Sequence, residues 1–341
     1  MINIAIDVMA GDLDIDVNIY GALDALDDLD GSFSIFLVGE ENLILEKMKF
    51  KKNKYPQCVH IVHASSFIKM DAKIADFRSD KNSSMYKGIE LIKKNDADAF
   101  ISIGNSGAIL ANSLTILGRI KGVSRPGFAI PMPSKNGVKI LIDGGANADA
   151  KKEHYLHFAL LGEQYIKTIF SKKNVKIGLL SIGEEPSKGN SLSLEAYNFL
   201  LEHCSGFIGN IEGNDLTNDK DVDVIVTDGF TGNIALKSIE GLAELIRGSL
   251  ILESKKSLKS IFGLFLLKSS LKNIYKRLDY RQYGAVPLLG VNGLVYVGHG
   301  KSDQATVKNA VKAAVLGVNS QLFESLKESV AKNIVNTRNI I

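Results

Sequence analysis

The stretch ISIGNSGAILANSL, residues 101–114, contains the element that decides the fold. A short apolar run, Phe100 to Ile103, ends at the glycine-rich corner Gly104-Asn105-Ser106-Gly107, and an almost wholly apolar helical pattern follows from Ala108 to Leu117. The first amide groups of a helix have no partner within the helix, and its dipole favours negative charge, so an anion is the physical default at such a corner. For a single corner, a tight turn that only needs small residues is the better explanation.

The same kind of corner recurs along the chain. Short β-rich runs end at glycine-rich or polar residues, and most are followed by apolar residues three and four apart, which predicts βαβ units on a mostly parallel sheet. Ligands bind beyond the carboxyl ends of the strands in such sheets. We therefore expect the polar corner residues to converge on one rim. They are Asp7, Asn105, Ser106, Asp143, Asn147, Glu184, Asp228 and Asn233.

Composition limits the class of protein. The chain has 341 residues, of which 45% are hydrophobic and 23% charged, which suits one large α/β domain or two tightly joined lobes. A net charge of +3 is too small to indicate a nucleic-acid partner. Cys58 and Cys204 are far apart, which predicts a reducing cytosol and neither disulfide nor zinc site. We expect no signal peptide, no membrane span, no metal and no cofactor.

Several catalytic signatures are missing from the sequence. The first strand is not followed by Gly-x-Gly-x-x-Gly, and neither a phosphate-binding P-loop nor a Gly-x-Ser-x-Gly elbow occurs. Neither cysteine lies in a corner. These patterns argue against a dinucleotide enzyme, a P-loop NTPase, an α/β-hydrolase and a cysteinyl acyl-enzyme.

Nine blocks resemble the bacterial phosphate acyltransferase family of phospholipid synthesis, and they occur in the family's order between residues 4 and 300. The blocks are IAIDVMAGD (4–12), RSDKNSSM (78–85), ISIGNSGAILA (101–111), LGRIKGVSRP (117–126), IDGGANAD (142–149), LLSIGEEPSKGN (179–190), FIGNIEGND (207–215), VTDGFTGNIALK (226–237) and YGAVPLLGVNGLVYVGHG (283–300). The resemblance implies that acyl carrier protein thioester and inorganic phosphate give acyl phosphate and free carrier protein. It also implies a three-layer α/β/α fold related to the phosphotransacetylases and to isopropylmalate dehydrogenase-like folds, usually as a homodimer.

The chain departs from the family pattern at two places. Leu13 stands where the family usually has histidine, and Asn214 stands where it usually has arginine. An imidazole and a cation are therefore lost, which predicts a reduced or altered affinity for phosphate.

The reaction needs phosphate held close to a thioester carbonyl by amide groups, hydroxyls and a cation. The corner Gly104 to Gly107 supplies amides and the Ser106 hydroxyl, and Ser83 and Ser84 are expected to open a second helix. Lys188 is the best cation within a corner, and Arg78 and Lys81 are the next candidates. Phosphate is itself the nucleophile, and Asp228 or His299 could give or organise a proton for the leaving thiolate. The other residues assigned to phosphate or substrate binding are Asp7, Asn105, Asp143, Asn147, Glu184, Asn190 and Asn233.

A basic segment differs from the rest of the chain. Residues 253–281 hold eight lysines or arginines and two acids, a net charge of +6. Apolar residues in them follow a helical spacing, and Gly263 predicts a helix pair with an uncharged tip at Ile261–Leu267. A buried dimer helix explains the apolar stripe, but an anionic membrane or the acidic carrier protein suits the tip.

The sequence thus predicts one catalytic domain over residues 1–330, with 249–281 as a basic amphipathic excursion and 331–341 as a tail. We expect a cytoplasmic, peripherally membrane-associated homodimer that passes acyl phosphate to a membrane glycerol-3-phosphate acyltransferase. A phosphotransacetylase acting on short acyl-CoA is one alternative. A carrier-protein or membrane adaptor with weakened catalysis, suggested by Leu13 and Asn214, is another.

Overall fold

The strands of the computed structural model, which describes residues 1–72, 80–134, 137–278 and 280–337, form two sheets and not the single sheet expected. The larger sheet has the order β3-β2-β1-β4-β12-β11-β5, and the smaller has the order β6-β7-β10-β8-β9. The chain passes from one sheet to the other at Ala129, between β5 (Gly127–Phe128) and β6 (Ile130–Ser134). The Ala129 amide still donates to the Pro287 carbonyl in the larger sheet, 3.1 Å away. One extended run therefore serves both sheets.

Most neighbouring strands are parallel, as predicted. In the larger sheet the parallel strands are β1 (Ile2–Asp7), β2 (Phe33–Gly39), β3 (Val59–His63), β4 (Ala99–Ser102) and β12 (Leu294–Gly298). In the smaller sheet they are β7 (Gly137–Ile142), β8 (Ile177–Leu180), β9 (Phe207–Ile211) and β10 (Val224–Val226). The exceptions are β11 (Ala285–Leu289), which is antiparallel to β12 and β5, and β6, which is antiparallel to β7.

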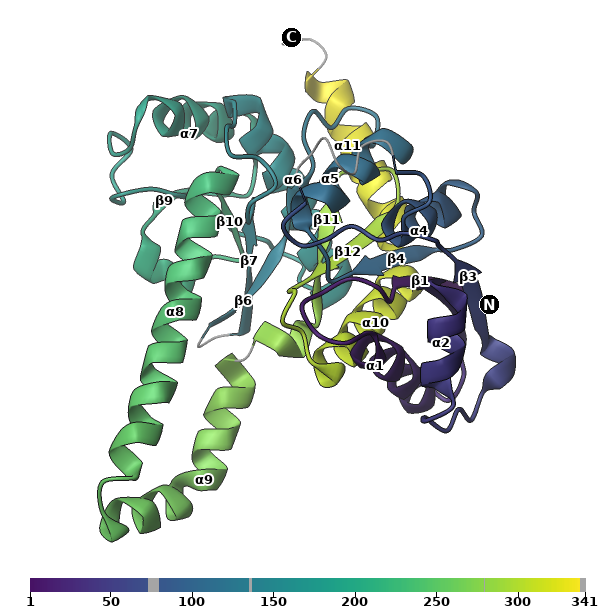
Figure 1. Cartoon of the computed structure of the whole chain (residues 1–341). Coiled ribbons are helices and arrows are strands. Elements are labelled where there is room, and N and C mark those ends of the chain that lie inside the picture. The colour runs from purple at the N-terminus through teal and green to yellow at the C-terminus, as the bar shows by residue number, and fades with distance from the viewer. Residues whose placement is uncertain (73–79, 135–136, 279, 338–341) are drawn as a thin grey trace.

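Alternation along the strands separates two hydrophobic cores, one on each face of the larger sheet. Ile4 and Ile6 pack into the core that includes helices α1 (Ile15–Asp28) and α10 (Gln304–Asn319). Ala5 points to the opposite face, towards the core that includes α4 (Ser84–Lys93) and α5 (Ser106–Ile116). Helices on both faces of a mostly parallel sheet confirm the predicted α/β/α layers (Figure 1).

The remaining elements complete the layers. Against the smaller sheet, α6 (Lys152–Phe170) contacts β7 and β10, and α7 (Ser191–His203) and α11 (Leu322–Thr337) contact α6. Helix α2 (Glu41–Met48) packs beside α1 and β3. Three short 3-10 helices are η1 (Pro56–Cys58), η2 (Gly213–Leu216) and η3 (Tyr280–Tyr283).

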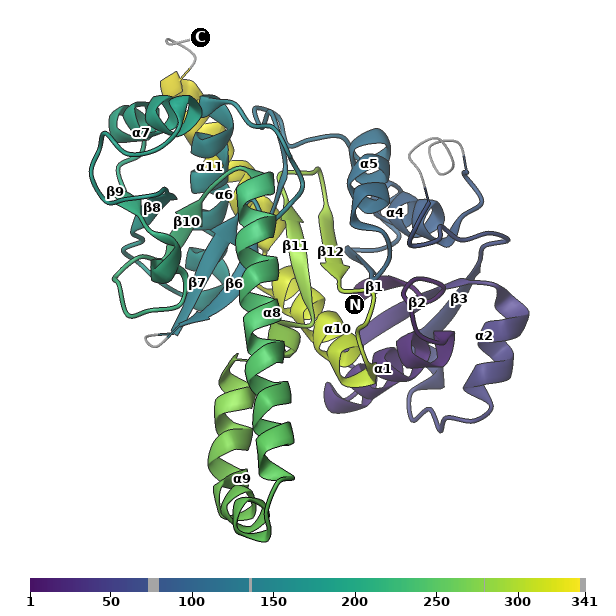
Figure 2. The ribbon, with the colours of Figure 1, turned by 60° about the vertical axis from the view of Figure 1, so that its left-hand side comes forward.

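A helical hairpin projects from the sheets as an arm (Figures 1 and 2). It consists of α8 (Gly229–Ser254) and α9 (Leu258–Leu278). The predicted helix pair is therefore present, but its bend was placed wrongly: it lies at residues 255–257, and Gly263 is inside α9. Glycine within a helix costs only about 1 kcal/mol, whereas the Ser257 hydroxyl accepts from the Ser260 amide at 3.0 Å and so caps the new helix. The arm also begins earlier than residue 249, because α8 starts at the end of β10.

Candidate active site

Asp7, at the carboxyl end of β1, is the centre of a first polar cluster. Its carboxylate is buried, with 2% exposure, and accepts the Met9 amide at 3.2 Å and the Ser102 hydroxyl at 3.1 Å. Burial raises the pKa of Asp7 to about 6, and the nearby hydroxyls of Ser84 and Ser102 oppose part of that rise. An ionised Asp7 would repel phosphate, so this residue fits a role in organising the loop, or in sharing a proton with a phosphate oxygen.

Two helices begin next to this cluster. Ser83 caps α4 by accepting the Tyr86 amide at 3.3 Å, and the fully buried Ser84 hydroxyl lies close enough to Asp7 to lower the pKa of that carboxyl. Asn105 caps α5 by accepting the Ala108 amide at 3.0 Å. Both predicted helix starts are therefore correct, and the N-terminal residues of α5 face open space because Ser106 and Gly107 are exposed. The Gly104 amide donates to Ser102 Oγ at 3.2 Å, which ties this corner to Asp7.

His299 follows β12 on the same side of the larger sheet. The Gly300 carbonyl accepts the Asp12 amide at 2.8 Å, so the loops after β1 and β12 touch. The half-buried ring of His299 accepts the Lys301 amide at Nδ1, 3.2 Å away, which leaves the proton of the neutral ring on Nε2. Lys81 is exposed just before α4, and Arg78 lies outside the described residues.

Asp143 is the centre of a second cluster, at the carboxyl end of β7. Its fully buried carboxylate accepts the amides of Phe128, Gly145 and Ala146 at one oxygen, at 3.0, 3.1 and 2.9 Å. The other oxygen accepts the backbone and side-chain amides of Asn147 at 2.7 and 2.8 Å. Burial raises the pKa of Asp143, and these hydrogen bonds oppose the rise. With its acceptor positions occupied, Asp143 anchors its own loop.

The start of α8 packs onto this loop. Asp228 caps α8: its Oδ1 accepts the Thr231 amide at 2.8 Å, and its Oδ2 accepts the Thr231 hydroxyl at 2.8 Å and the Tyr155 hydroxyl at 3.4 Å. A Cβ atom at Gly232 would lie 2.0 Å from the Asp143 carbonyl oxygen, so only glycine fits there. Asn233 is exposed and faces Gly145. The sequence blocks 142–149 and 226–237 are therefore in contact, and each limits which residues fit in the other.

Lys188 lies in a third group, on the loop after β8. Its carbonyl accepts the Ser181 hydroxyl at 3.1 Å, and the buried Asn210 side chain donates to the Glu185 carbonyl at 2.8 Å. The Lys188 side chain is exposed and forms no ion pair with any described residue. Asn190 caps α7 by accepting the Ser193 amide at 2.8 Å. The loop is thus fixed to the sheet while its cation is free to bind.

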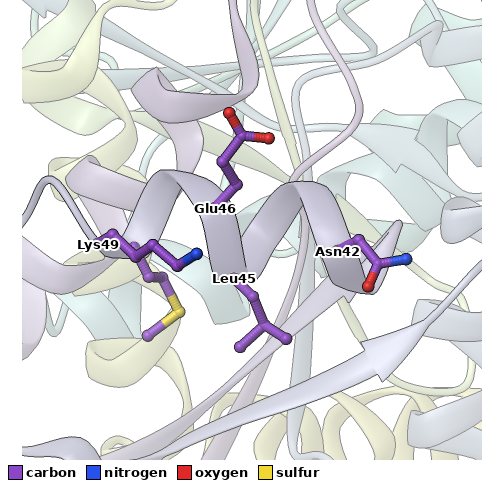
Figure 3. A pocket seen from close by; sticks show the side chains of 5 residues that line it. Asn42, Leu45, Glu46 and Lys49 are labelled. Carbon is purple, nitrogen blue, oxygen red and sulfur yellow. The ribbon is translucent and has the colours of Figure 1, made fainter.

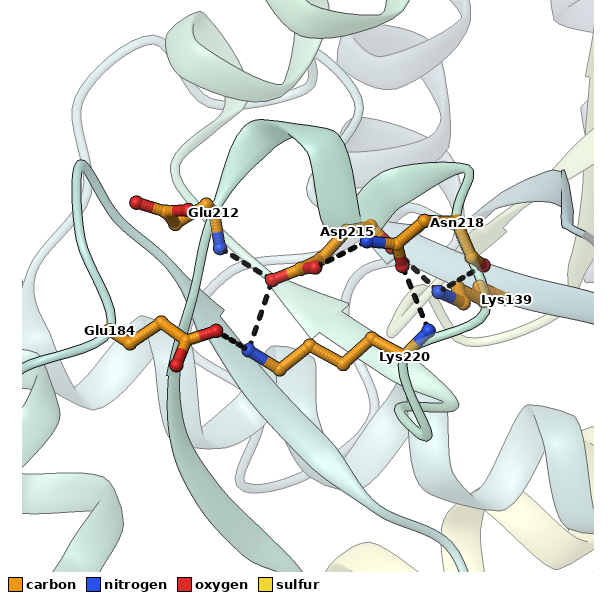
Figure 4. A network of polar contacts seen from close by, with 6 residues as sticks. All are labelled: Lys139, Glu184, Glu212, Asp215, Asn218 and Lys220. Atoms are coloured by element: carbon orange, nitrogen blue, oxygen red, sulfur yellow. Dashed lines mark hydrogen bonds and ion pairs between the residues drawn. The ribbon is translucent and has the colours of Figure 1, made fainter.

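Glu184, on the same loop, belongs to a network that the sequence did not reveal (Figure 4). Lys220 Nζ lies 2.5 Å from Glu184 and 3.1 Å from Asp215. Asp215 also accepts the Glu212 amide at 2.9 Å and the Asn218 side chain at 2.7 Å. Lys139, 3% exposed in the middle of β7, donates to the Asp215 carbonyl at 2.6 Å. A lysine inside the apolar run GVKILI was the one available signal of this network.

The strand-end corners are divided between two sheets, and their convergence on a single rim stays a prediction. The corners after β1, β4 and β12 belong to the larger sheet, whereas those after β7, β8 and β10 belong to the smaller one. Asp7, Ser84, Gly104 and Asn105 form one group with neighbouring backbone, while Asp143, Asn147, Asp228 and Asn233 form another. The described hydrogen bonds therefore link these polar residues within two separate groups, one at the strand ends of each sheet.

A shallow hollow lies elsewhere, on α2 (Figure 3). It is lined by Asn42, Leu45, Glu46, Met48 and Lys49. All of them come from one helix and the residue that follows it, and no strand end contributes. Asn42 lies in the first turn of α2, but its amide already donates to the Glu40 carboxylate at 3.1 Å, so this hollow is a poor candidate for an anion site.

Comparison with known proteins gives a consistent assignment over nearly the whole chain. The family described as "Fatty acid synthesis protein" matches residues 2–325. The chain is 42% identical to a phosphate acyltransferase of Thermodesulfovibrio yellowstonii over 330 residues, covering 97% of this chain and 94% of the relative. It is 43% identical to a phosphate acyltransferase of Fervidobacterium nodosum, covering 96% and 98%.

Solved structures share the fold at low sequence identity. A phosphotransacetylase from Streptococcus pyogenes superposes with a TM-score of 0.62 at 17% identity, covering 95% of this chain and 94% of the other. A branched-chain phosphotransacylase from Enterococcus faecalis gives 0.54 at 13% identity, covering 93% and 100%. The predicted relation to the phosphotransacetylase fold is confirmed.

Proposed function

This chain belongs to the fatty acid synthesis protein family and, as an acyltransferase, to its phosphate acyltransferases, and we propose that its acyl donor is acyl carrier protein thioester. The products are then acyl phosphate and free carrier protein, for phosphatidic acid and membrane phospholipid synthesis. The observation that carries this proposal is the 42% identity to a phosphate acyltransferase over nearly the full length of the chain. The carrier protein and the pathway rest on the resemblance of the nine sequence blocks.

The chemical step does not require a nucleophile from the protein. A phosphate oxygen attacks the thioester carbonyl carbon, the carbon–oxygen bond forms, and the carbon–sulfur bond breaks. The leaving thiol has a pKa of about 8.5, taking a free thiol as guide, so protonation of the thiolate helps but is not essential. The protein must therefore hold phosphate close to the thioester and stabilise the developing negative charge on the carbonyl oxygen.

We assign phosphate to the N-terminus of α5 and to the Lys188 side chain. The exposed corner at Ser106 and Gly107 offers amide groups, a hydroxyl and the positive end of a helix dipole. Lys188 offers a cation that no described carboxylate neutralises. The two groups lie at the ends of strands in different sheets and no described contact joins them, so their membership of one site is part of the proposal.

Lys81 and Arg78 are secondary cation candidates, and Ser83 and Ser84 a second helix start. Asn105 and Asn190 enter this proposal as caps that orient the helices, while Asp143, Asn147 and Asn233 shape the loop under α8. Glu184 enters it through Lys220. Asp7 then orders the loop below the α5 corner.

His299 is the better candidate for the proton that the leaving thiolate takes. Its Nδ1 accepts a backbone amide, so the neutral ring carries a transferable proton on Nε2. Asp228 accepts hydrogen bonds from Thr231 and Tyr155, and burial followed by the charge of Asp228 raises the pKa of Tyr155. Asp228 then acts as a helix cap that orients neighbouring groups.

The arm supports two further parts of the proposal, a homodimer and membrane attachment. Ile234, Leu242, Leu245 and Ile246 are exposed on α8 at helical spacing, and a second copy of the chain would cover such an apolar face. Near the far end, Phe262 and Phe265 are 63% and 68% exposed next to exposed Lys255, Lys256 and Lys259. Apolar side chains flanked by lysines suit the anionic cytoplasmic face of a membrane.

Attachment to a membrane would also serve the product. Acyl phosphate is reactive, and delivery at the membrane surface shortens its path to a membrane glycerol-3-phosphate acyltransferase, which we propose as the next enzyme. None of the helices in the described part of the chain is sufficiently long and apolar to cross a bilayer. The proposal treats residues 1–330 as one catalytic unit from which the arm extends.

Phosphate-dependent consumption of acyl carrier protein thioester by the purified chain tests this function. A short-chain phosphotransacetylase would instead prefer short acyl-CoA, and the exposed apolar end of the arm favours the carrier-protein donor over it. A weakened adaptor would bind carrier protein or membrane without turnover. Asn214 is exposed on η2, and Leu13 is 49% exposed, so neither departure from the family pattern removes a buried group.

A further inference from the structure

Residues 117–126 form a cationic loop between α5 and β5, on the path from the larger to the smaller sheet (Figure 2). The loop contains Arg119, Lys121 and Arg125 and no acidic residue. All three basic residues are exposed, and neither Lys121 nor Arg125 forms an ion pair with a described residue. Three unneutralised positive charges within seven positions attract an acidic partner.

Contacts within the loop fix its conformation. The Arg119 guanidinium donates to the Ser124 carbonyl, and the Ser124 hydroxyl lies 2.8 Å from Nδ1 of His157 on α6. The Val123 amide donates to the Ile120 carbonyl at 2.9 Å, which closes a turn with Lys121 at its outer corner. Burial lowers the pKa of His157 to about 4, so the ring is neutral at physiological pH and holds Ser124.

The start of α6 extends the same charged surface. Burial and then the positive charge of Arg125 lower the pKa of His154; Glu153 opposes this shift and Lys151 adds to it, so both cations act on the same ring. Lys151 is exposed immediately before α6. We name Lys121, Arg125 and Lys151 the loop cations. Asp149 and Glu153 are the acids nearest in sequence and only partly offset the charge.

This surface adjoins the second polar cluster, around Asp143. The Asn147 side chain donates to the Pro126 carbonyl at 2.7 Å, and the Phe128 amide donates to Asp143 at 3.0 Å. A partner bound on the loop cations therefore lies beside the strand ends of the smaller sheet. The basic end of the arm is far from these strand ends. Helix α8 begins beside them, after Asp228, and its 26 residues extend about 39 Å away.

We propose that the loop cations are the docking surface for the acidic carrier protein that bears the acyl thioester. This inference rests on the proposed function, because it assumes a carrier-protein donor. The pantetheine arm of such a donor is about as long as five extended residues, roughly 17 Å, which is too short to reach the strand ends from the far end of α8. The end of the arm then binds the membrane, and the loop cations bind the carrier protein.

The test compares donors with and without a carrier protein. The charge-reversed triple variant Lys121→Glu, Arg125→Glu, Lys151→Glu is expected to raise KM for acyl carrier protein at least tenfold. KM for acyl-pantetheine, which has no protein and no phosphate, and KM for phosphate are expected to stay within twofold. In the parent chain, KM for the carrier thioester rises with salt, because salt screens exposed charges.

Matched controls separate docking from net charge and from damage. Lys52→Glu, Lys93→Glu, Lys173→Glu together change the charge by the same amount at exposed positions elsewhere, and are expected to leave KM for the carrier within twofold. A milder Lys121→Ala, Arg125→Ala, Lys151→Ala variant keeps the test valid if the reversed one does not fold. An unchanged KM for the carrier, an equal rise in the control, or an equal rise with acyl-pantetheine overturns the proposal.

A direct measurement of carrier-protein binding tests the docking surface without depending on turnover. Calorimetric titration with carrier protein is expected to show at least tenfold weaker binding for the charge-reversed variant than for the parent. Equal binding overturns the docking surface. If the parent binds carrier protein through the loop cations yet forms no acyl phosphate from any donor, the proposed function fails and the docking surface stands.

Discussion

The side-chain Nδ2 of Asn210 donates a hydrogen bond of 2.8 Å to the carbonyl oxygen of Glu185. Asn210 lies on β9 and is 5% exposed, so this bond attaches the loop that carries Lys188 to the buried part of the smaller sheet. The Lys188 side chain itself is exposed. Asn210 and Ser181 hold the main chain of this loop, and the Lys188 ammonium group takes no part in holding it. A change at Lys188 is therefore expected to affect binding and not folding.

Replacement of Lys188 by alanine is therefore expected to affect phosphate and not the fold. One lost charged contact costs a few kcal/mol at most, which predicts a KM for phosphate raised at least tenfold and slower turnover. The melting temperature should stay within about 2 °C of the parent. Phosphate saturation curves and thermal melts measure both quantities. Normal saturation by phosphate in this variant would remove Lys188 from the site.

Replacement of Lys220 by methionine tests the network in Figure 4. The change removes the contacts to Glu184 and Asp215, while Asp215 keeps the Glu212 amide and the Asn218 side chain. We expect a loss of about 1–2 kcal/mol in the free energy of unfolding, above the value of an exposed pair. Lys176→Met, which breaks the exposed pair with Asp221, is the matched control and should cost clearly less stability, because solvent screens an exposed pair. Equal losses for both variants in denaturant unfolding would show that the network is an ordinary surface contact.

The raised pKa of Asp7 makes the stability of the fold depend on pH. Because burial raises its pKa from 3.8 to about 6, the folded chain binds this proton more tightly than the unfolded chain does. Protonated Asp7 thus stabilises the fold at low pH, and this contribution is lost as the pH rises from about 4 to about 6. Asp7→Asn should be more stable than the parent at pH 7, by up to about 3 kcal/mol, and equally stable near pH 4. Unfolding at a series of pH values measures this, and a difference that does not change with pH would contradict it.

The far end of the arm predicts reversible membrane binding. Apolar burial at about 25 cal/mol per Å² gives a few kcal/mol for two or three large side chains, and each nearby lysine adds roughly 1 kcal/mol at an anionic surface. Phe262→Asp with Phe265→Asp should therefore release the chain from anionic vesicles in a flotation assay. Leu201→Asp with Ile208→Asp, at exposed apolar positions outside the arm, is the control. If the arm variant floats as well as the parent, the membrane proposal fails.

Much of the fold was predictable because local signals agreed with the tertiary structure. The corner from Gly104 to Gly107 does end β4 and begin α5, with Asn105 as the cap, as a polar residue before an apolar helical pattern predicts. The division into two sheets was not predictable in this way. It depends on Ala129, where one extended run changes partners from β11 to β7, and strand pairing over such distances leaves no local signal.

The candidate site was predictable only in its residue types. Asp143 and Asn147 looked like ligand-binding residues, yet both carboxylate oxygens of Asp143 accept hydrogen bonds within the protein and the Asn147 side-chain amide group donates to Pro126 and Asp143. The sequence does not single out Asn210 and Lys220 because their partners Glu185 and Glu184 lie on a different loop, and sequence spacing does not reveal which loops meet. The bend of the arm lies next to the capping residue Ser257 and not at Gly263, because a glycine inside a helix costs little and a cap fixes where the helix begins.

The most direct measurement is phosphate-dependent release of carrier thiol. The purified chain is incubated with acyl carrier protein thioester, with and without inorganic phosphate, and the free thiol and the hydroxylamine-trapped acyl phosphate are quantified. The proposed function predicts that both appear in equal amounts, and only when phosphate is present. Release of thiol without phosphate, or no acyl phosphate at any phosphate concentration, would contradict it.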